Sequence, residues 1–593
     1  MILTPVSIEN NFPSSKEVVL LGSWCKNIYT TEVPLENIVP YHWEDKKKLQ
    51  KDYKYIDNLY ETLLPIFAKE MNAYHNCSCS TMFWRISCGN WLLSFVTVAF
   101  DRWSMMRSAL EIFDIKEIAV LNLQRDFWIP KNMEEFTKLC SKSDEWNSHL
   151  FHAISREISD VKITDFQVKV SKNRRVFKKE KIKNFALSLK KKVFNFNKII
   201  LSTLSKNNEI VFVDSYLPTP EQWKIEKKLR QFPSSFEFDE PISSTFRNKS
   251  RKKIIAIPYE SKNNFESFLV SIIPGQIPSS YLEDYNLILS KFRKFPSFSS
   301  VKVIFTANAH LTNDQFNIWS AHAKEHGAKL VIGQHGGGTR ILKVDQNLDH
   351  EYAICDYYIA WGNGGLINKK DTVLPINKFS EYLPKKNSKK KGLLHVLDFS
   401  YRYIQHIYSN EATSSYMDYL IDQNIFSKSI NNKSHKGYKL RPNKNSFNAG
   451  WYDDIKVAES YPIDKEKHFI RSILNNRVVL VSANQTTLLQ SLAMNIPTVA
   501  FWDSEIVLLE ETALKDYKKL YDVGILYDSP RDAANHINEQ WDNIEEWWNS
   551  SQIQTARKEF CIKYIYTSSN SDRVEKWSTF FNQLIENKSS NDF

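Results

Sequence analysis

Short runs of β-branched and aromatic residues that end in small or polar residues recur along the chain. Before residue 370 such runs lie at 18–25, 209–216, 301–310, 329–336 and 356–364, and after residue 390 at 392–402, 477–487, 496–503 and 524–529. Helical stretches such as 313–327, which has Gly327 in C-cap position, separate them. Alternation of strand and helix is typical of parallel sheets covered by helices. The pattern therefore predicts an α/β fold.

A stretch rich in Lys, Pro and Asn at 374–392 interrupts this alternation and has the composition of a linker. We therefore expect two Rossmann-like domains that face a cleft. The first lobe, on the acceptor side, is expected over 1–385 and includes a large helical, aromatic-rich insertion at about 41–205. The second lobe is expected over 386–540, and helices at 541–593 are expected to pack back on the first lobe.

Composition adds an expectation about the compartment. The 593 residues are 42% hydrophobic and 13% aromatic, which is enough for packed cores and argues against global disorder. Seven scattered cysteines, an odd number, suit a reducing compartment. The first residues lack a basic segment followed by an apolar core, and the longest nearly apolar run, 91–100, is shorter than the ~20 residues of a membrane span. We expect a cytoplasmic protein without a spanning anchor.

The net charge of +11 is concentrated in one segment. Residues 169–198 contain twelve Lys or Arg and a single acid, Glu180, interleaved with phenylalanines. Such a segment is either the solvated face of a helix or linker, or a basic and aromatic surface that binds anionic lipid headgroups. The second interpretation predicts a peripheral protein at the inner face of the bacterial cytoplasmic membrane. Nucleic acid would attract the same charge, but no recognition motif accompanies it, so we expect no nucleic-acid partner.

Glycine is scarce in this chain, with 15 residues in 593, yet three stand together after a predicted strand. The loop reads Gln334, His335, Gly336, Gly337, Gly338. Ligands of open α/β sheets bind beyond the carboxyl ends of the strands, and glycine allows a backbone to approach a ligand closely. We therefore expect Gln334 and the three glycines to contact the donor, with the loop backbone against its sugar or carboxylate. The alternative is a tight turn in which His335 caps a strand end.

Histidine suits proton transfer near neutral pH, so His335 is a candidate acid or base. His350 and Glu351 follow a short loop and are expected to face the same cleft as further catalytic candidates. Eight of the 15 glycines lie between 327 and 365, including three after the next predicted strand: Gly362, Gly364 and Gly365. Two adjacent strand ends without side-chain bulk predict the floor of a cleft.

A second candidate element begins where the predicted strand at 477–487 gives way to a helix. The free N–H groups and the dipole of a helix start bind anions. Threonine hydroxyls at such a start either bind phosphate or merely cap the helix. We expect this element to hold the phosphate of a donor through Ser482, Asn484, Gln485, Thr486 and Thr487.

Six segments carry a likeness to known proteins: YHWEDKKKLQKDYKYIDNLYETLL, FWRISCGNWLLSFVTVAFDRW, GQHGGG, CDYYIAWGNG, LRPNKNSFNAGW and NQTTLLQSLAMNIPTVAFWD. Together they resemble the sugar transferases of O-antigen and related surface-polysaccharide clusters. The resemblance extends from near residue 17 to the C-terminal helices. The glutamine–histidine–glycine loop is also similar, more weakly, to capsule enzymes that use CMP-activated ulosonic acids such as Kdo.

The resemblance implies a glycosyltransferase of the two-lobed GT-B architecture. The first lobe would bind a glycan or lipid-linked glycan acceptor, and the second a nucleotide-sugar, with a CMP-activated ulosonic acid as one option. In many such enzymes an acidic residue of the donor helix holds the ribose, and Gln490 occupies that place here. We expect three further residues to contact the donor phosphate or diphosphate from the other side: Ser400, Arg402 and Arg441.

No paired-aspartate motif stands at a strand end, so we expect no metal requirement and no cofactor. Positive groups and helix starts would stabilise the departing nucleotide instead. Two alternatives stay open. A similar scaffold would also suit transfer of another activated group, such as glycerol phosphate from CMP-glycerol. A non-catalytic scaffold of a polysaccharide assembly complex would keep the fold without the chemistry.

Overall fold

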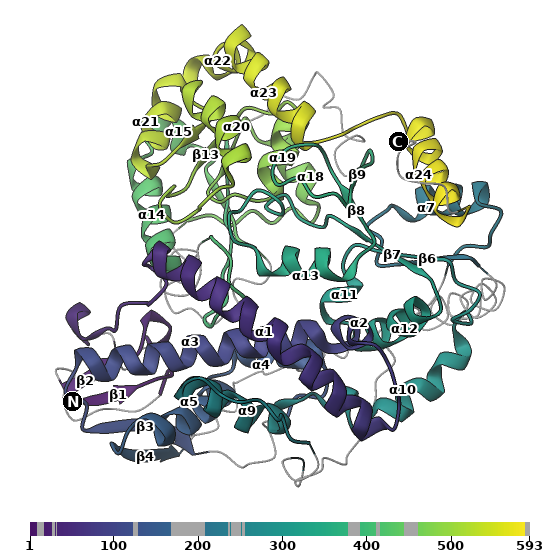
Figure 1. Cartoon of the computed structure of the whole chain (residues 1–593). Helices are drawn as coiled ribbons and strands as arrows, with labels where there is room; N and C mark the ends of the chain where they lie inside the picture. The colour runs from purple at the N-terminus through teal and green to yellow at the C-terminus, as the bar shows by residue number, and fades with distance from the viewer. Residues whose placement is uncertain are drawn as a thin grey trace, which may run out of the picture.

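The computed structural model describes residues 1–8, 17–26, 30, 32–122, 129–167, 208–234, 238, 251, 255–376, 392–410, 415–443 and 461–586. The basic segment 169–198 and most of the predicted linker at 374–392 lie outside the described residues. Three sheets, each with parallel strand pairing, organise the described chain (Figure 1).

The central sheet has the strand order β5-β6-β7-β8-β9. Its strands are β5 (Ile210–Val213), β6 (Val303–Thr306), β7 (Lys329–Gly333), β8 (Tyr357–Ala360) and β9 (Asp371–Val373). The first four are nearly continuous hydrophobic runs, as expected of parallel strands that are covered on both faces. Helix α12 (Asp314–Glu325) lies between β6 and β7 in the chain, and α13 (Gln346–Ile354) lies between β7 and β8.

The C-terminal sheet has the strand order β11-β10-β12-β13-β14. Its strands are β10 (Leu393–Val396), β11 (Lys439–Arg441), β12 (Val478–Val481), β13 (Thr498–Phe501) and β14 (Leu526–Tyr527). The helices around it are α14 (Ser415–Ser429), α19 (Thr486–Ala493), α20 (Glu511–Asp522) and α21 (Pro530–Gln540) (Figure 1). With the central sheet it forms two Rossmann-like lobes, which confirms the predicted fold class.

The N-terminal residues form a third sheet, which the sequence pattern does not separate from the first lobe. Its order is β2-β1-β3-β4, with strands β1 (Ile2–Thr4), β2 (Val18–Leu20), β3 (Glu117–Asn122) and β4 (Lys162–Gln167). The run at 18–25 therefore pairs with β1 and does not join the central sheet. β1 has three residues and β4 is largely polar, so neither shows the hydrophobic run used to predict strands. The run of β3 was not predicted either.

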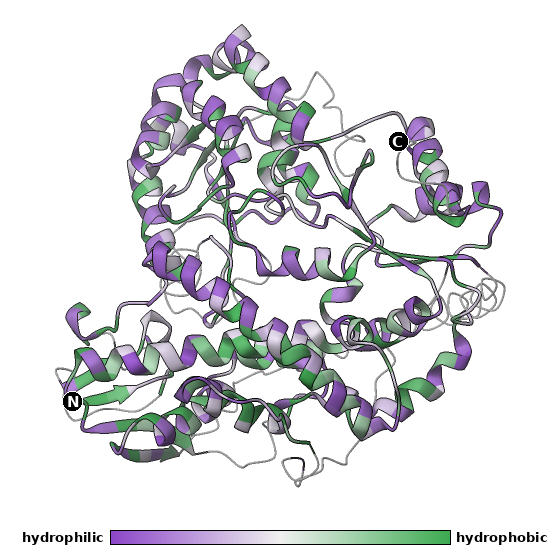
Figure 2. Cartoon of the chain, viewed as in Figure 1, coloured by the Kyte–Doolittle hydropathy of each residue, from purple (hydrophilic) through white to green (hydrophobic). Residues whose placement is uncertain are grey.

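The predicted helical, aromatic-rich region is present beside this third sheet. Its longest members, α1 (Lys46–His75) and α3 (Asn90–Ile112), pack against each other, and α3 also packs on α5 (Asp144–Ile158). Figure 2 shows that α1 is mostly hydrophobic where it crosses α3. A π-helical turn, Arg85–Gly89, leads into α3.

The C-terminal helices divide between the two lobes. α23 (Ser551–Tyr564) packs on α19 and α20 of the C-terminal lobe. The chain then crosses to the central sheet, where α24 (Asn570–Ile585) lies beside α7 (Thr219–Lys228) (Figure 1). The ring of Phe581 in α24 lies 5.1 Å from that of Phe212 and 5.8 Å from that of Phe305, centroid to centroid.

The two lobes are joined by backbone pairing directly after the glycine loop. Leu342 forms an antiparallel bridge with Leu509 of the C-terminal lobe. The N–H of Lys343 donates to the carbonyl of Leu508 at 2.9 Å, and the N–H of Glu510 donates to that of Ile341 at 2.9 Å. These bonds hold the segment after the glycine loop against the segment that follows β13.

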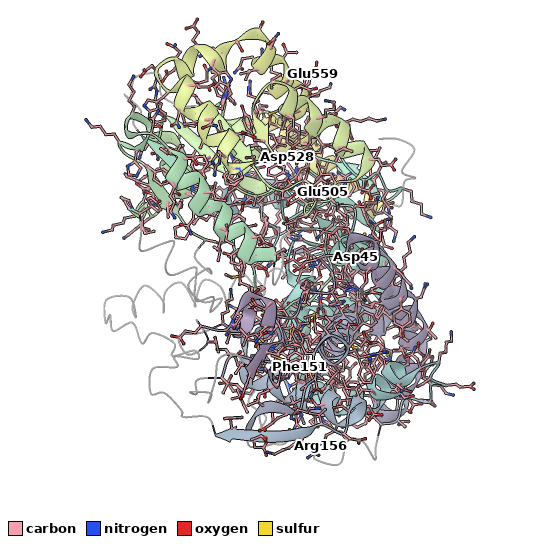
Figure 3. All side chains as sticks on the ribbon, turned by 90° about the vertical axis from the view of Figure 1, so that its left-hand side faces the viewer. Asp45, Phe151, Arg156, Glu505, Asp528 and Glu559 are labelled. Carbon is pink, nitrogen blue, oxygen red and sulfur yellow. The ribbon has the colours of Figure 1, made fainter. Side chains whose placement is uncertain are left out.

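In the side view of Figure 3 the molecule is elongated. Phe151 and Arg156, on α5 beside the N-terminal sheet, lie toward one end, and Asp528 and Glu559 of the C-terminal lobe lie toward the other. In the part of the chain that the structure describes, no helix combines the length and the apolar character that crossing a bilayer requires.

Candidate active site

Three residues from neighbouring elements form a polar cluster at the carboxyl end of the central sheet. Glu351 of α13 is fully buried, and its Oε1 accepts a hydrogen bond of 2.9 Å from Nε2 of His310. The same oxygen lies 3.4 Å from Nδ1 of His335, in the loop after β7. His310 follows β6, on the one-turn helix α11 (Ala309–Thr312). Because β6 and β7 are adjacent parallel strands, their carboxyl ends bring both histidines to one carboxylate.

The protonation of this cluster follows from its hydrogen bonds. Burial opposes ionisation of Glu351, but the hydrogen bonds from His310 and His335 prevail and lower its pKa to about 2. A carboxylate only accepts hydrogen bonds, so Nε2 of His310 and Nδ1 of His335 both carry hydrogen. The His335 side chain is 26% exposed, whereas those of His310 and Glu351 are 1% and 0% exposed. The cluster therefore presents one imidazole at the surface, backed by a buried carboxylate.

His350 is adjacent to Glu351 in sequence but lies against a different element. A Cβ placed on Gly89, in the π-helical turn, would lie 3.5 Å from Cε1 of His350. Burial, reinforced by the charges of His310 and Arg85, lowers the pKa of His350 to about 3, so its ring is neutral at physiological pH. A ring that is only 3% exposed does not reach a substrate at the surface, which argues against the catalytic role predicted for it.

Gln334 shapes the loop that carries His335. Its backbone N–H donates to the carbonyl of Ile359 in β8 at 2.8 Å. Its side-chain Oε1 accepts from the N–H of Trp361 at 2.9 Å, and its Nε2 donates to the carbonyl of Gly336 at 2.9 Å. Both ends of this amide are thus used inside the protein, in place of the donor contact predicted for it.

The glycine loop approaches the other lobe. None of its three glycines has a positive φ, so their use is to save space. A Cβ on Gly337 would lie 2.7 Å from Cα and 2.9 Å from the backbone N of Thr486, and one on Gly338 would lie 3.2 Å from the carbonyl oxygen of Asn484. The N–H of Gly337 also donates to Oγ1 of Thr486 at 2.9 Å. We expected a sugar against this backbone, and the structure places the start of α19 there.

The second group of glycines is also packed against protein, and the predicted cleft floor is wrong for them. A Cβ on Gly362 would lie 2.1 Å from the carbonyl oxygen of Lys563, and one on Gly364 would lie 2.5 Å from the ring of Tyr564. Gly365 has φ +79° and lies against the carbonyl of Arg340. Because these glycines have no side chains, the end of α23 can pack against the central lobe.

The start of α19 has hydrogen-bond donors without acceptors. Gln485 is its N-cap residue, and no side chain caps the helix. Nδ2 of Asn484 and Nε2 of Gln485 are buried and have no hydrogen-bond partner in the described part of the chain. Asn484 is held in place because its Oδ1 accepts from the hydroxyl of Tyr517 at 3.0 Å. Such a cluster of donors at a helix start favours an anion.

The hydroxyl groups predicted to bind phosphate are engaged to different degrees. Ser482 is fully buried, and its hydroxyl pairs with that of Tyr419 at 2.9 Å. Thr486 accepts the N–H of Gly337, as described above. Thr487 is buried in the first turn of α19, and Gln490 is buried one turn later. Of the predicted side chains at this helix, Asn484 and Gln485 thus retain the clearest capacity to donate to a ligand.

The two arginines assigned to phosphate are bound within the protein. Arg402 is buried, pairs with Asp144 of α5 at 2.7 Å and donates to the carbonyl of Trp24 at 2.6 Å. Arg441 pairs with Asp464 and donates to the carbonyl of Glu466 at 2.9 Å. The first arginine thus joins the loop after β10 to α5 and to the turn after β2, and the second lies at the end of β11, in place of the predicted phosphate contacts. Ser400, also predicted, is buried in the same β10 loop.

The sequence pattern did not predict a role for His310, although it predicted the segment that contains this residue. The run 301–310 was predicted as a strand with a polar end, and His310 is the last residue of that run. The signal was a histidine shortly after a strand that precedes the glycine-loop strand in the chain. Sequence alone did not show that β6 and β7 are neighbours in the sheet, which is what brings His310 to Glu351.

The loop that carries a partly exposed imidazole, backed by a buried carboxylate, thus contacts an uncapped helix start at the joint of two parallel α/β lobes. Comparison with known families gives the class of protein. Residues 1–581 match the family described as LIC12162 family transferase, and the chain therefore belongs to that family of transferases. No curated protein matches the sequence.

Several solved structures are similar in part. The wall teichoic acid polymerase TagF is 12% identical, with 68% of this chain and 98% of that chain covered and a TM-score of 0.32. A glycosyltransferase from Rickettsia africae is 14% identical over 64% of this chain and 98% of that one, with a TM-score of 0.33. Anabaena HepE in complex with UDP-glucose is 10% identical over 63% and 99%, with a TM-score of 0.34. Because these TM-scores are low, the description of the fold depends on the strand order given above and not on these structures.

The glycine loop yields a test of how the lobes meet. Gly337→Ala would place a Cβ within 3 Å of the Thr486 backbone, which has no room to move without opening the joint. We expect overpacking of about 1–3 kcal/mol, seen as a lower thermal unfolding midpoint. Gly336→Ala is the matched control, because its Cβ would meet only Oγ1 of Thr339, at 3.5 Å. Equal midpoints for the two variants would contradict this packing.

Proposed function

We propose that the protein transfers a sugar from a nucleotide-sugar donor to a hydroxyl of a surface-polysaccharide or lipid-linked glycan acceptor. One observation carries the proposal: the loop of His335 is bonded to the start of α19 through Gly337 and Thr486. His335, the candidate base, lies two residues before Gly337, which contacts the candidate phosphate site on the other lobe. The contact therefore holds the base and the phosphate site near each other. Membership of a transferase family agrees with group transfer.

The proposed step is a displacement at the anomeric carbon of the donor. The acceptor hydroxyl gives its proton to Nε2 of His335, which is the ring nitrogen without hydrogen. The acceptor oxygen bonds to the anomeric carbon while the bond from that carbon to the phosphate oxygen breaks, and the electron pair leaves with the nucleotide. Glu351 stabilises the imidazolium, and the donors at the start of α19 stabilise the phosphate.

The charges around the helix start favour a donor with one phosphate. Arg402 and Arg441 are already paired with carboxylates, so within the described residues the groups that α19 offers to a ligand are neutral N–H donors. Neutral donors suit the single negative charge of the phosphate group in a CMP-linked sugar better than the larger charge of a diphosphate. Together with the resemblance to surface-polysaccharide transferases, this supports a CMP-activated ulosonic acid as donor.

The first test concerns His335. After a thermal-shift screen with CMP, UDP, GDP and TDP has identified the nucleotide, turnover is measured with the corresponding donor. We expect His335→Ala to reduce kcat by roughly 10²–10⁴-fold, because an acid–base group is lost, and to leave nucleotide binding unchanged. His326→Ala, at an exposed histidine after α12, is the control and should turn over normally. Normal turnover by His335→Ala would refute the proposed base.

The second test concerns the phosphate site. Asn484→Asp keeps the acceptor that Tyr517 needs but replaces an unpaired N–H donor with a negative oxygen. Loss of a charge-assisted hydrogen bond of roughly 1.5–3 kcal/mol, with added repulsion, should weaken nucleotide binding at least about tenfold. Asn570→Asp makes the same change at the exposed start of α24 and should bind normally. Calorimetric titration in which both variants bind like the wild type would exclude this site.

The third test concerns the basic segment 169–198. We propose that it holds the enzyme at the anionic membrane surface, where a lipid-linked acceptor is found. Each Lys or Arg near such a surface contributes about 1 kcal/mol, so partial engagement of the twelve suffices. The protein should co-sediment with anionic vesicles, less so in high salt, and not with neutral vesicles. Equal binding to both kinds of vesicle, or to neither, would rule this out.

A further inference from the structure

Glu351 has two histidine partners, and only one of them faces the solvent. His310 makes the shorter contact, at 2.9 Å, yet its ring is 1% exposed and reaches no substrate. Its position is firmly set, because its backbone carbonyl accepts from Nδ2 of Asn317 in α12 at 3.0 Å. The carbonyl of Leu311, the next residue, accepts from Nδ2 of Asn90 at 2.8 Å. A buried histidine fixed in this way acts on the carboxylate and not on the substrate.

The carboxylate depends on its donors. A fully buried carboxyl group tends to keep its proton, and hydrogen bonds from donors are what make it ionise. In the described part of the chain Glu351 accepts from His310 and faces His335, while its Oε2 has no hydrogen-bond partner. Removing His310 would leave one contact, at 3.4 Å, to offset complete burial. The group would then regain its proton.

The state of Glu351 decides which nitrogen of His335 is basic. Against an ionised carboxylate, Nδ1 of His335 must donate, so the neutral ring has its lone pair on Nε2. Against a protonated carboxyl group, Nδ1 would accept, and Nε2 would carry the hydrogen. Only the first tautomer offers a base on the side of the ring away from Glu351.

We propose that His310 is a positioning residue that keeps Glu351 an ionised acceptor and thereby holds His335 in the tautomer with a basic Nε2. The role of that nitrogen in transfer rests on the proposed function, whereas the tautomer is a property of the protein alone. Four other ionisable groups interact electrostatically with members of the cluster: Asp345, His350, Cys355 and Tyr358. Arg85 of the π-helical turn and His406 of the loop after β10 act on His350. None of them is bonded to the carboxylate of Glu351 among the described residues.

Two substitutions separate the hydrogen bond from the bulk of the side chain. His310→Gln places an amide Nε2 where the imidazole Nε2 stands, so it still donates to Glu351. His310→Leu fills similar space without a donor. We expect His310→Gln to keep kcat within about tenfold of wild type, and His310→Leu to lose roughly 10²–10⁴-fold, as for a base held in the wrong tautomer. Nucleotide affinity and the KM of the acceptor should stay unchanged in both variants.

The tautomer is measured directly, without substrate. In protein labelled with ¹⁵N-histidine, two-bond ¹H–¹⁵N correlation spectra distinguish the tautomers, and His335→Ala identifies the signals of His335. Wild type and His310→Gln should show hydrogen on Nδ1 of His335, and His310→Leu should show it on Nε2. Hydrogen on Nε2 in the wild type would overturn the proposal, and this measurement requires no substitution to fold.

The outcomes separate the two proposals. An unchanged His335 tautomer in a folded His310→Leu variant would refute the positioning role, as would equal loss of turnover in the Gln and Leu variants. If the tautomer follows the donor at residue 310 but the wild type transfers no sugar with any donor found in the nucleotide screen, the positioning role stands and the proposed function fails.

Discussion

The candidate site depends on one close approach, that of the Gly337 backbone to the start of α19. The candidate site has two halves: the imidazole of His335 belongs to the central lobe, and the candidate anion site at the start of α19 belongs to the C-terminal lobe. The bond of 2.9 Å from Gly337 to Thr486 joins them, and the absence of a side chain at residue 337 allows it. The pairing of Leu342 with Leu509 extends the same joint along the chain. The joint between the lobes thus combines backbone pairing at Leu342 and Leu509 with one side-chain acceptor, Oγ1 of Thr486.

Burial of Glu351 is the second constraint, and it explains why histidines surround it. A carboxylate without water requires donors, and the adjacent ends of β6 and β7 supply one each. Both histidines approach the same oxygen, Oε1, so Glu351 orients the ring of His335. His350, the preceding residue, has no hydrogen-bond partner among the described residues and stays neutral against the π-helical turn. Two neighbouring residues of one helix therefore serve different purposes because they face different surroundings.

The sequence could predict those features of the fold that depend on local patterns of hydrophobic and polar residues. Except for β9 and β11, the strands of the central and C-terminal sheets are hydrophobic runs with polar ends, so the α/β class could be predicted from them. Contacts between distant segments could not be predicted, because no periodicity records them. Arg402 meets Asp144 across 258 positions, and Gly337 meets Thr486 across 149. Both were therefore assigned to a ligand, which is the usual partner of an arginine or a glycine loop at a strand end.

These contacts bear on how the proposed reaction is stabilised. Before transfer, buried Glu351 carries a negative charge beside His335, and the start of α19 has a positive potential. Transfer places a positive charge on His335 and a negative charge on the departing phosphate. Each new charge arises beside a partner of opposite sign that is already in place, so little reorganisation is required. The loop from His335 to Gly337 keeps the two pairs together, and a joint that opened by even a small distance would weaken both at once.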